Sequence, residues 1–161
     1  MKTCTKCGEP KPLTEFGKHA ISKDSYAHWC KECHKTKYRE YAKTASGVYT
    51  AIKQRIKYYK TKPFHISRED FVNWYDSTTK QCEYCGVYEI ELEKLGDSYN
   101  NKAHRLTIDC INNDAGYVKG NLVLACLRCN SIKSDFFTHD EMKELAITFI
   151  LPKWEAILYE R

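Results

Sequence analysis

Residues 106–134 read LTIDCINNDAGYVKGNLVLACLRCNSIKS, and their pattern predicts several elements in a defined order. Residues 106–110 and 121–125 have the composition of strands, and the ten residues between them include two glycines. A C-x2-C pair follows the second segment, and residues 130–134 are expected to form a helix. The stretch therefore predicts two strands, a metal-binding cysteine turn and a helix, in that order.

Eight of the nine cysteines fall into four C-x2-C pairs. Because a tight turn can direct both sulfurs of such a pair at one ion, four pairs suit two tetrahedral zinc sites. A secreted disulfide framework is the alternative, but the odd number of cysteines and the lack of an apolar N-terminal signal segment disfavour it. We therefore expect two structural zinc ions, one held by Cys4, Cys7, Cys30 and Cys33, and one held by Cys82, Cys85, Cys126 and Cys129.

Basic residues are concentrated between positions 31 and 62. This segment holds ten Lys or Arg, two Glu and five Tyr, a local net charge of +8, whereas the whole chain carries +5. Basic side chains with aromatic ones between them suit a polyanion whose phosphates need neutralising. The segment therefore favours nucleic acid as a partner. The alternative is a solvated helix face whose tyrosines pack on the core.

The 161 residues are enough for one domain of ordinary size or for two small modules. We expect residues 1–62 to form an N-terminal Cys4 zinc knuckle with a basic helical DNA-binding segment. Residues 63–161 are expected to form the unit that contains residues 106–134. No apolar run reaches transmembrane length, so we expect a soluble, intracellular, cytoplasmic protein without a membrane partner.

Single residues indicate where the helices begin and end. Gly47 is expected to separate two basic helices. Ser67 and Thr138 each precede a helical pattern and are expected to cap it, with an acidic residue three positions later. Pro152 is expected to break the last long helix.

Asp109 ends the first expected strand, and Asn130 opens the helix that follows the second. A carboxylate oxygen and a neutral amide oxygen are ligands that Mg²⁺ favours, with its other positions left to water and substrate phosphate. Zinc held by the second set of cysteines would pin the start of this helix and so fix Asn130 relative to Asp109. The stretch is therefore expected to bind one divalent cation.

The same stretch resembles the HNH, or ββα-metal, endonucleases. The matching residues are Ile108-Asp109, Gly116-Tyr117, Asn121 and the C-x2-C-N-x2-K run at 126–133. The chain is most similar to the small two-zinc PacI-like restriction endonucleases, which share its order of elements from Cys4 to Met142. The shared segments are the N-terminal Cys4 knuckle, F-x-x-W-Y at Phe71 to Tyr75, C-x-Y-C, and F-x-x-x-E-M at Phe137 to Met142.

The resemblance implies an α+β fold, a ββα core with an N-terminal Cys4 knuckle and flanking helices. It also implies a Mg²⁺-dependent endonuclease acting on double-stranded DNA. Asp109 and Asn130 would ligate the catalytic Mg²⁺, and Asn121 would brace the loop between the strands through hydrogen bonds to its backbone. Most HNH enzymes place a histidine, the general base, where this chain has Cys110. A thiol is a poor substitute, because it is mostly protonated in the cell.

Three other residues are candidates for the base. Tyr75, which ends the F-x-x-W-Y segment, could serve if a nearby cation lowered its pKa from about 10. His104 lies shortly before the first strand, and His65 lies before the helix that carries Tyr75. Other interpretations stay open: Tyr75 as a core aromatic, His104 as a surface residue, and Cys110 as a small buried side chain.

DNA contacts are expected from the basic segment and from two residues near the second zinc site. Arg128 lies between two zinc cysteines, and Lys133 lies on the following helix, where it could hold a phosphate or be solvated. The expected contacts are Lys53, Arg55, Lys57, Lys60, Arg128 and Lys133.

One HNH centre cuts one strand, so cleavage of a duplex would call for a homodimer, which also suits a palindromic target. We expect a site-specific enzyme of restriction or homing type, encoded by a bacterium or a phage, with no small-molecule substrate. Cys110 supports a different possibility, a zinc-dependent DNA-binding protein whose nuclease centre is degenerate. A structural zinc protein acting through protein partners is a third, but it leaves the basic segment without a role.

Overall fold

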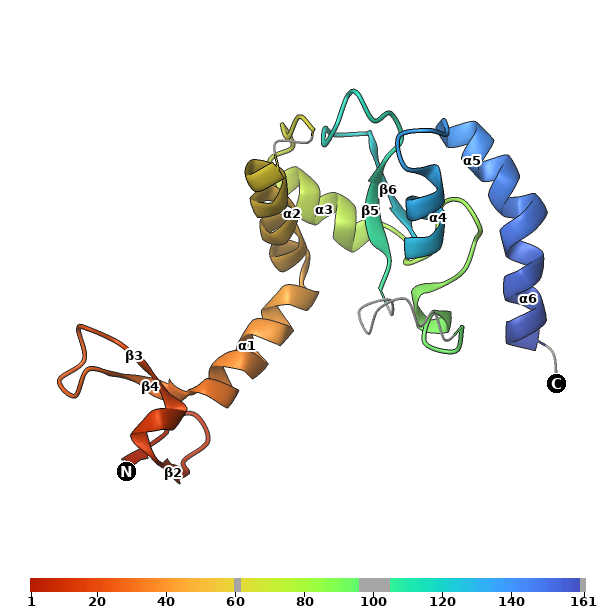
Figure 1. The fold of residues 1–161 in the computed structure, drawn as a ribbon. Coiled ribbons are helices and arrows are strands. Elements are labelled where there is room, and N and C mark those ends of the chain that lie inside the picture. Colours follow the sequence, from red (N-terminus) through yellow and green to blue (C-terminus); the bar gives the residue numbers. More distant parts are fainter. Residues whose placement is uncertain (60–61, 96–104, 160–161) are drawn as a thin grey trace. The chain divides into compact units, whose positions relative to one another are not determined.

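The computed structural model describes residues 1–59, 62–95 and 105–159. The chain divides into two compact units, Met1–Ile52 and Lys53–Arg161 (Figure 1). In the described residues, helices accompany three small two-stranded antiparallel sheets, so the predicted α+β class is confirmed. None of the helices described is both long and apolar enough to cross a lipid bilayer.

The core of the first unit contains two of the unit's four cysteines. Cys4, Phe16 and Cys30 are buried at its centre, and Tyr26 and Trp29 pack against them. Because so few apolar side chains form this core, a bound metal would have to supply much of its stability. Two hairpins and a one-turn 3-10 helix, η1, surround it, and their bounds are β1 (Lys2–Thr3), β2 (Pro10–Lys11), η1 (Leu13–Glu15), β3 (Phe16–Lys18) and β4 (Tyr26–Cys30).

The basic segment forms two helices, α1 (Lys31–Lys43) and α2 (Ala45–Tyr59). The expected break at Gly47 is wrong, because the helices separate at Thr44. Thr44 Oγ1 accepts a hydrogen bond from Gly47 N at 3.1 Å, and Thr44 thus caps the start of α2. Gly47 is needed for a different reason, since a Cβ atom there would lie 2.0 Å from the carbonyl oxygen of Tyr41. The boundary between the compact units falls inside α2.

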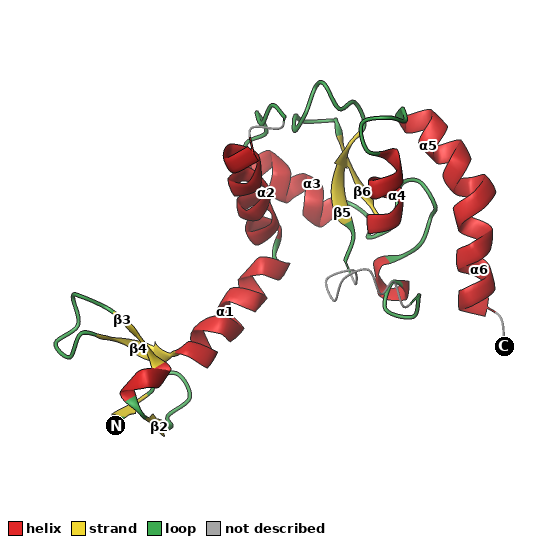
Figure 2. Cartoon of the chain, in the orientation of Figure 1, coloured by secondary structure: helices red, strands yellow, loops and turns green. Residues whose placement is uncertain are grey.

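The second unit contains the ββα arrangement that residues 106–134 predicted (Figure 2). β5 (Thr107–Cys110) and β6 (Leu122–Ala125) pair antiparallel, with Asp109 opposite Val123, and α4 (Leu127–Lys133) follows. α3 (Arg68–Ser77) precedes them, and its first turn is capped as expected, because Ser67 Oγ accepts from Asp70 N at 3.0 Å.

A 3-10 turn, η2 (Glu89–Glu91), follows the third cysteine pair. The chain ends in one long helical stretch made of α5 (His139–Leu145), a π-helical turn η3 (Ala146–Ile150) and α6 (Leu151–Tyr159). Thr138 caps α5 in a capping box with Glu141, as expected. The expected break at Pro152 is wrong, because Pro152 lies in the first turn of α6. Proline has no backbone N–H to donate to the preceding turn. The π-helical turn immediately before it shifts the pattern of backbone hydrogen bonds, so the helix continues through Pro152.

Candidate active site

The eight paired cysteines form the two clusters that the sequence predicted. In each cluster the sulfur atoms all lie within 4.8 Å of one another. The sulfurs of Cys4 and Cys33 are 3.8 Å apart, and those of Cys85 and Cys126 are also 3.8 Å apart. Two sulfurs bound about 2.3 Å from a tetrahedral zinc are separated by about 3.8 Å, so both clusters fit zinc. All nine cysteines are free, which favours zinc over the disulfide alternative.

The second cluster joins the start of α4 to the turn that carries Tyr84. Cys126 is the N-cap of α4, and its sulfur accepts from Cys129 N at 3.4 Å. Tyr84 lies between the other two cysteines of the cluster, and the neighbouring Glu83 N donates to Leu124 O at 2.8 Å. A zinc ion here would therefore fix α4, β6 and Tyr84 relative to one another.

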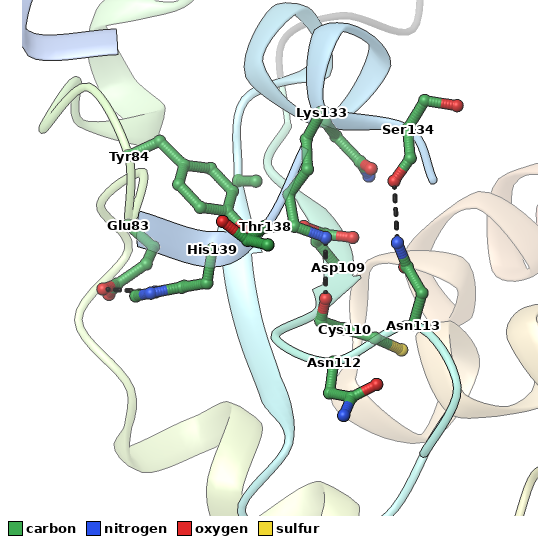
Figure 3. A network of polar contacts seen from close by, with 12 residues as sticks. Glu83, Tyr84, Asp109, Cys110, Asn112, Asn113, Lys133, Ser134, Thr138 and His139 are labelled. Atoms are coloured by element: carbon green, nitrogen blue, oxygen red, sulfur yellow. Dashed lines mark hydrogen bonds and ion pairs between the residues drawn. The ribbon is translucent and has the colours of Figure 1, made fainter. Parts of the chain in front are cut away.

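The carboxylate of Asp109 is buried between this turn and α4, with 5% of the residue exposed (Figure 3). Tyr84 Oη donates to Asp109 Oδ2 at 2.6 Å. Lys133 Nζ lies 3.3 Å from the same oxygen and donates to Cys110 O at 3.0 Å. Lys133 is fully buried, so the alternative that its side chain is solvated is wrong. Burying an acid and an ammonium together carries a desolvation cost that their mutual attraction repays only in part.

Tyr84 is held as a hydrogen-bond donor. Burial, together with the hydrogen bond to the Asp109 carboxylate, raises the pKa of Tyr84 above its ordinary value. Its ring packs on the imidazole of His139 with centroids 5.6 Å apart, and His139 Nε2 lies 3.2 Å from Glu83 Oε1. The phenol therefore stays protonated near neutral pH and orients the carboxylate instead of accepting a proton.

Asn130 presents its amide oxygen for a further ligand. The hydroxyl of Thr107 donates its single proton to Ala125 O at 2.9 Å, so it must act as acceptor toward Asn130 Nδ2, 2.7 Å away. This contact sets the orientation of the amide group, and Asn130 Oδ1 has no hydrogen-bond partner among the described residues. Thr107 and Asp109 are two apart on β5, so their side chains point to the same face of the strand. α4 therefore brings Asn130 and Lys133 to the face of β5 that carries Asp109.

Asn121 holds the loop between β5 and β6. Its Nδ2 donates to Asn112 O at 2.8 Å and to Gly116 O at 2.7 Å, and its Oδ1 accepts from Asn112 N at 2.9 Å. These contacts are of the kind that the resemblance implied for Asn121. Gly116 needs to be glycine here, because its φ is +64° and a Cβ atom would lie 2.4 Å from Pro63 O.

Cys110 is a buried thiol with 1% exposure. Burial raises its pKa to about 11, and the smaller effects of Lys62 and Lys133 act in the opposite direction. Lys62 is held beside this loop by a hydrogen bond of 2.5 Å to Asn113 Oδ1. Since the thiol is protonated at neutral pH, these facts favour a small buried side chain over a general base.

The alternative bases lie in different surroundings. Tyr75 is buried in α3, stacks on Phe71, and its hydroxyl accepts from Arg105 Nη2 at 2.9 Å. Lys80 Nζ lies 3.9 Å from the centre of its ring, so cations do lie beside Tyr75. Arg105 comes just before β5, whereas Asp109 is near the end of that strand, and Tyr75 makes no hydrogen bond to Asp109 in the described part of the chain. His65 is exposed. His104 lies outside the described residues.

The expected DNA contacts differ in exposure. Lys53, Arg55 and Lys57 are exposed on α2, and Arg55 Nη2 also donates to Tyr117 Oη at 3.4 Å. The exposed guanidinium of Arg128 lies 5.3 Å from the ring centre of Trp154. Lys60 lies outside the described residues. Lys133 can contact DNA only if the substrate reaches Asp109.

Comparison with known proteins gives one structural match. No protein-family profile matches the chain, and no curated protein matches it. Among solved structures, the rare-cutting HNH restriction endonuclease PacI matches with a TM-score of 0.59 and 23% sequence identity, covering 97% of each chain. The chain has the fold of PacI. The predicted HNH architecture is thereby confirmed at the level of the fold, including both four-cysteine clusters that could hold zinc.

Within the PacI fold, the sequence analysis missed the tyrosine that contacts Asp109. Tyr75 stays a prediction as the general base, whereas the tyrosine on the Asp109 carboxylate is Tyr84. C-x-Y-C indicates that zinc ligands on both sides would hold Tyr84 rigidly, but it does not say where the hydroxyl points. The buried pair of Lys133 and Asp109 had no such local signal.

Proposed function

We propose that this protein is a divalent-metal-dependent HNH endonuclease that hydrolyses phosphodiester bonds in double-stranded DNA. The observation that carries the proposal is the buried carboxylate of Asp109 on a ββα frame whose helix presents the amide oxygen of Asn130. The fold shared with an HNH restriction endonuclease supports it. The exposed basic residues of α2 support DNA as the substrate.

Asp109 and Asn130 would hold the catalytic cation, Mg²⁺ in the proposal. Tyr84 and Lys133 occupy only Oδ2 of Asp109, and Oδ1 has no hydrogen-bond partner among the described residues. One carboxylate oxygen and one amide oxygen fit the preference of Mg²⁺ for oxygen ligands, with room for water and phosphate. When bound, Mg²⁺ supplies stabilisation of the negative charge that develops on the phosphate and the leaving oxygen.

The remaining residues of the site position these ligands. Tyr84 orients the Asp109 carboxylate, Thr107 orients the Asn130 amide, and Asn121 fixes the loop that follows β5. Cys110 is not proposed as the base, because its thiol is protonated at neutral pH. Tyr75 and His104 stay the candidates for accepting the proton of the attacking water.

We further propose that the enzyme cuts both strands at a specific, palindromic site, in a restriction or homing role, as a homodimer. One site of this kind cuts one strand, and a two-fold symmetric dimer places a second site on the opposite strand. Two structural zinc ions per chain would hold the protein in its active form.

A plasmid assay tests the proposal. Supercoiled plasmid with zinc-loaded protein and Mg²⁺ should be converted to nicked or linear DNA, and EDTA should prevent this. Asp109→Ala should abolish cleavage and leave DNA binding intact. Asp114→Ala is the matched control, because it removes an exposed carboxylate from the loop that follows β5. Equal cleavage by the Asp109 variant would overturn the metal assignment.

A zinc-dependent DNA-binding protein with an inactive centre is the second candidate. Two observations favour it: a protonated thiol stands where a histidine base is usual, and the Lys133 ammonium already neutralises Asp109. Such a protein would retard DNA in a gel and leave plasmid uncut at every Mg²⁺ concentration. The assay above therefore separates the two candidates.

A further inference from the structure

The first unit contains a cavity of about 270 Å³ outside the candidate active site. It lies where β4 leads directly into α1, beside the cysteine cluster of this unit. Three imidazoles, an indole and an ammonium group line it, and none of the lining residues is acidic. The lining residues are His19, Ala27, His28, Trp29, His34 and Lys37.

Two lysine side chains lie close to Trp29, Lys37 from the lining of this cavity and Lys6 from outside the lining. Lys37 Nζ lies 4.8 Å from the centre of the Trp29 ring, and Lys6 Nζ lies 5.6 Å from it. The ring of His34 packs against the indole with centroids 5.5 Å apart. Because a tryptophan ring attracts cations, contact with Trp29 restricts each flexible lysine side chain and lowers the entropy that it would lose on binding an anion.

These two ammonium groups have no carboxylate partner in the described residues. Other lysines of the same unit do: Lys2 pairs with Asp24 at 2.6 Å, and Lys35 pairs with Glu32 at 3.7 Å. Neither ammonium group is therefore paired with a carboxylate in the described part of the chain, and both can pair with an external anion.

The cysteine turn holds Lys6 in place. Lys6 lies between two cysteines of the first cluster, Cys4 and Cys7. Cys30 N donates to Cys4 Sγ at 3.2 Å, and Thr5 N donates to His28 O at 3.1 Å, so the turn is fastened to the end of β4 that carries Trp29. Lys6 and Lys37 therefore meet at Trp29 because of the fold, although they are far apart in the sequence.

We propose that the surface formed by Lys6, Trp29, His34 and Lys37 binds one backbone phosphate of DNA. The ligand is a phosphodiester, because the groups present are cations and nitrogen donors gathered around an aromatic ring, without an acid that would repel an anion. The inference rests on the proposed function in taking DNA as the ligand, but it does not require that the DNA be cut.

Salt-dependent binding of a labelled DNA duplex, measured by fluorescence anisotropy without Mg²⁺, tests this site. Losing one phosphate contact reduces the slope of log K against log salt by about 0.9, which corresponds to about eightfold weaker binding at 0.1 M salt.

Lys37→Gln and the double variant Lys6→Gln/Lys37→Gln should approach this loss. Lys35→Gln is the matched control, since it removes a charge from the same helix but away from Trp29, and it should keep the slope. Equal effects of the Lys35 and Lys37 variants would overturn the proposal.

Substituting Trp29 separates an organised site from general attraction. Trp29→Ala removes no charge, yet it should weaken binding as much as Lys37→Gln, whereas Trp29→Phe should keep most of the affinity. Unchanged binding by a Trp29→Ala protein that retains two zinc ions per chain would refute the role of the indole. If that variant does not fold, the exposed lysine variants still decide the matter.

Two further results identify the ligand and keep this site distinct from the nuclease proposal. Inorganic phosphate, titrated at constant ionic strength without DNA, should perturb the protein only weakly. Tight binding of it that depends on Lys37, together with DNA affinity that does not, would overturn DNA as the ligand. A protein that never cuts plasmid but loses the salt slope with Lys37→Gln would refute the nuclease and support this site.

Discussion

The buried pair of Lys133 and Asp109 should be among the strongest interactions in the second unit. Lys133→Met removes the ammonium while keeping a side chain of similar length. It leaves the Asp109 carboxylate, 5% exposed, with only Tyr84 as a partner, and Cys110 O without its donor. Asp109→Asn has the converse effect and leaves a buried ammonium without an acid.

The size of the effect follows from the geometry. Two unit charges 3.3 Å apart attract each other by about 5 kcal/mol at an effective dielectric constant of 20, and desolvation offsets part of this. Removing one partner of a buried pair costs about 3–5 kcal/mol, so each single variant should lose that much stability. The double variant Asp109→Asn/Lys133→Met should lose less than the sum of the two, with a coupling of about 2–3 kcal/mol.

Urea unfolding of the zinc-loaded protein without Mg²⁺ measures these free energies, and zinc content must be equal in all four proteins. Lys143→Met is the control, because its pair with Glu83 is partly exposed and should contribute about 0–1 kcal/mol. A coupling below about 0.5 kcal/mol would refute the conclusion that the two buried charges depend on each other.

Three further predictions concern the positions around this pair. Thr107→Val should lower Mg²⁺-dependent cleavage by about 10–100-fold, because the Asn130 amide loses its orienting partner, while Thr107→Ser should stay within about threefold in single-turnover assays. Tyr84→Phe should lose more activity than Tyr75→Phe, because only Tyr84 contacts Asp109; the opposite ranking would favour Tyr75 as the base. With its pKa raised to about 11, Cys110 should be about one part in 3,000 thiolate at pH 7.5. Its alkylation in zinc-loaded protein, followed by mass spectrometry, should therefore rise about tenfold per pH unit up to about pH 11, and a plateau below pH 9 would contradict this.

Features that depend on neighbouring residues could be predicted from the sequence. Ser67 and Thr138 cap their helices as expected, because a cap is a contact between residues three positions apart. The sequence predicted two helix boundaries wrongly, at Gly47 and at Pro152, because nearby residues outweighed the usual effect of a glycine or a proline. Thr44 caps the start of α2, so the helices separate there and not at Gly47, and a π-helical turn lets Pro152 lie within a helix.

The details of the candidate site depended on contacts between distant residues. Tyr84 and Asp109 are 25 positions apart, and nothing in C-x-Y-C says where the hydroxyl points. Lys133 was expected to hold a phosphate or be solvated, since lysine is rarely buried without a partner. The complete burial of Lys133 is explained only by the strand pairing that places Asp109 beneath α4.

Cleavage of supercoiled plasmid by the zinc-loaded protein, compared with its Asp109→Ala variant in the same Mg²⁺ series, shows whether Asp109 belongs to a nuclease centre. We predict that the parent protein cuts the plasmid, that the variant binds the same DNA without cutting it, and that Asp114→Ala cuts like the parent. Cleavage by the Asp109 variant, or DNA binding by the parent without any cleavage, would contradict the assignment of this site as a nuclease centre.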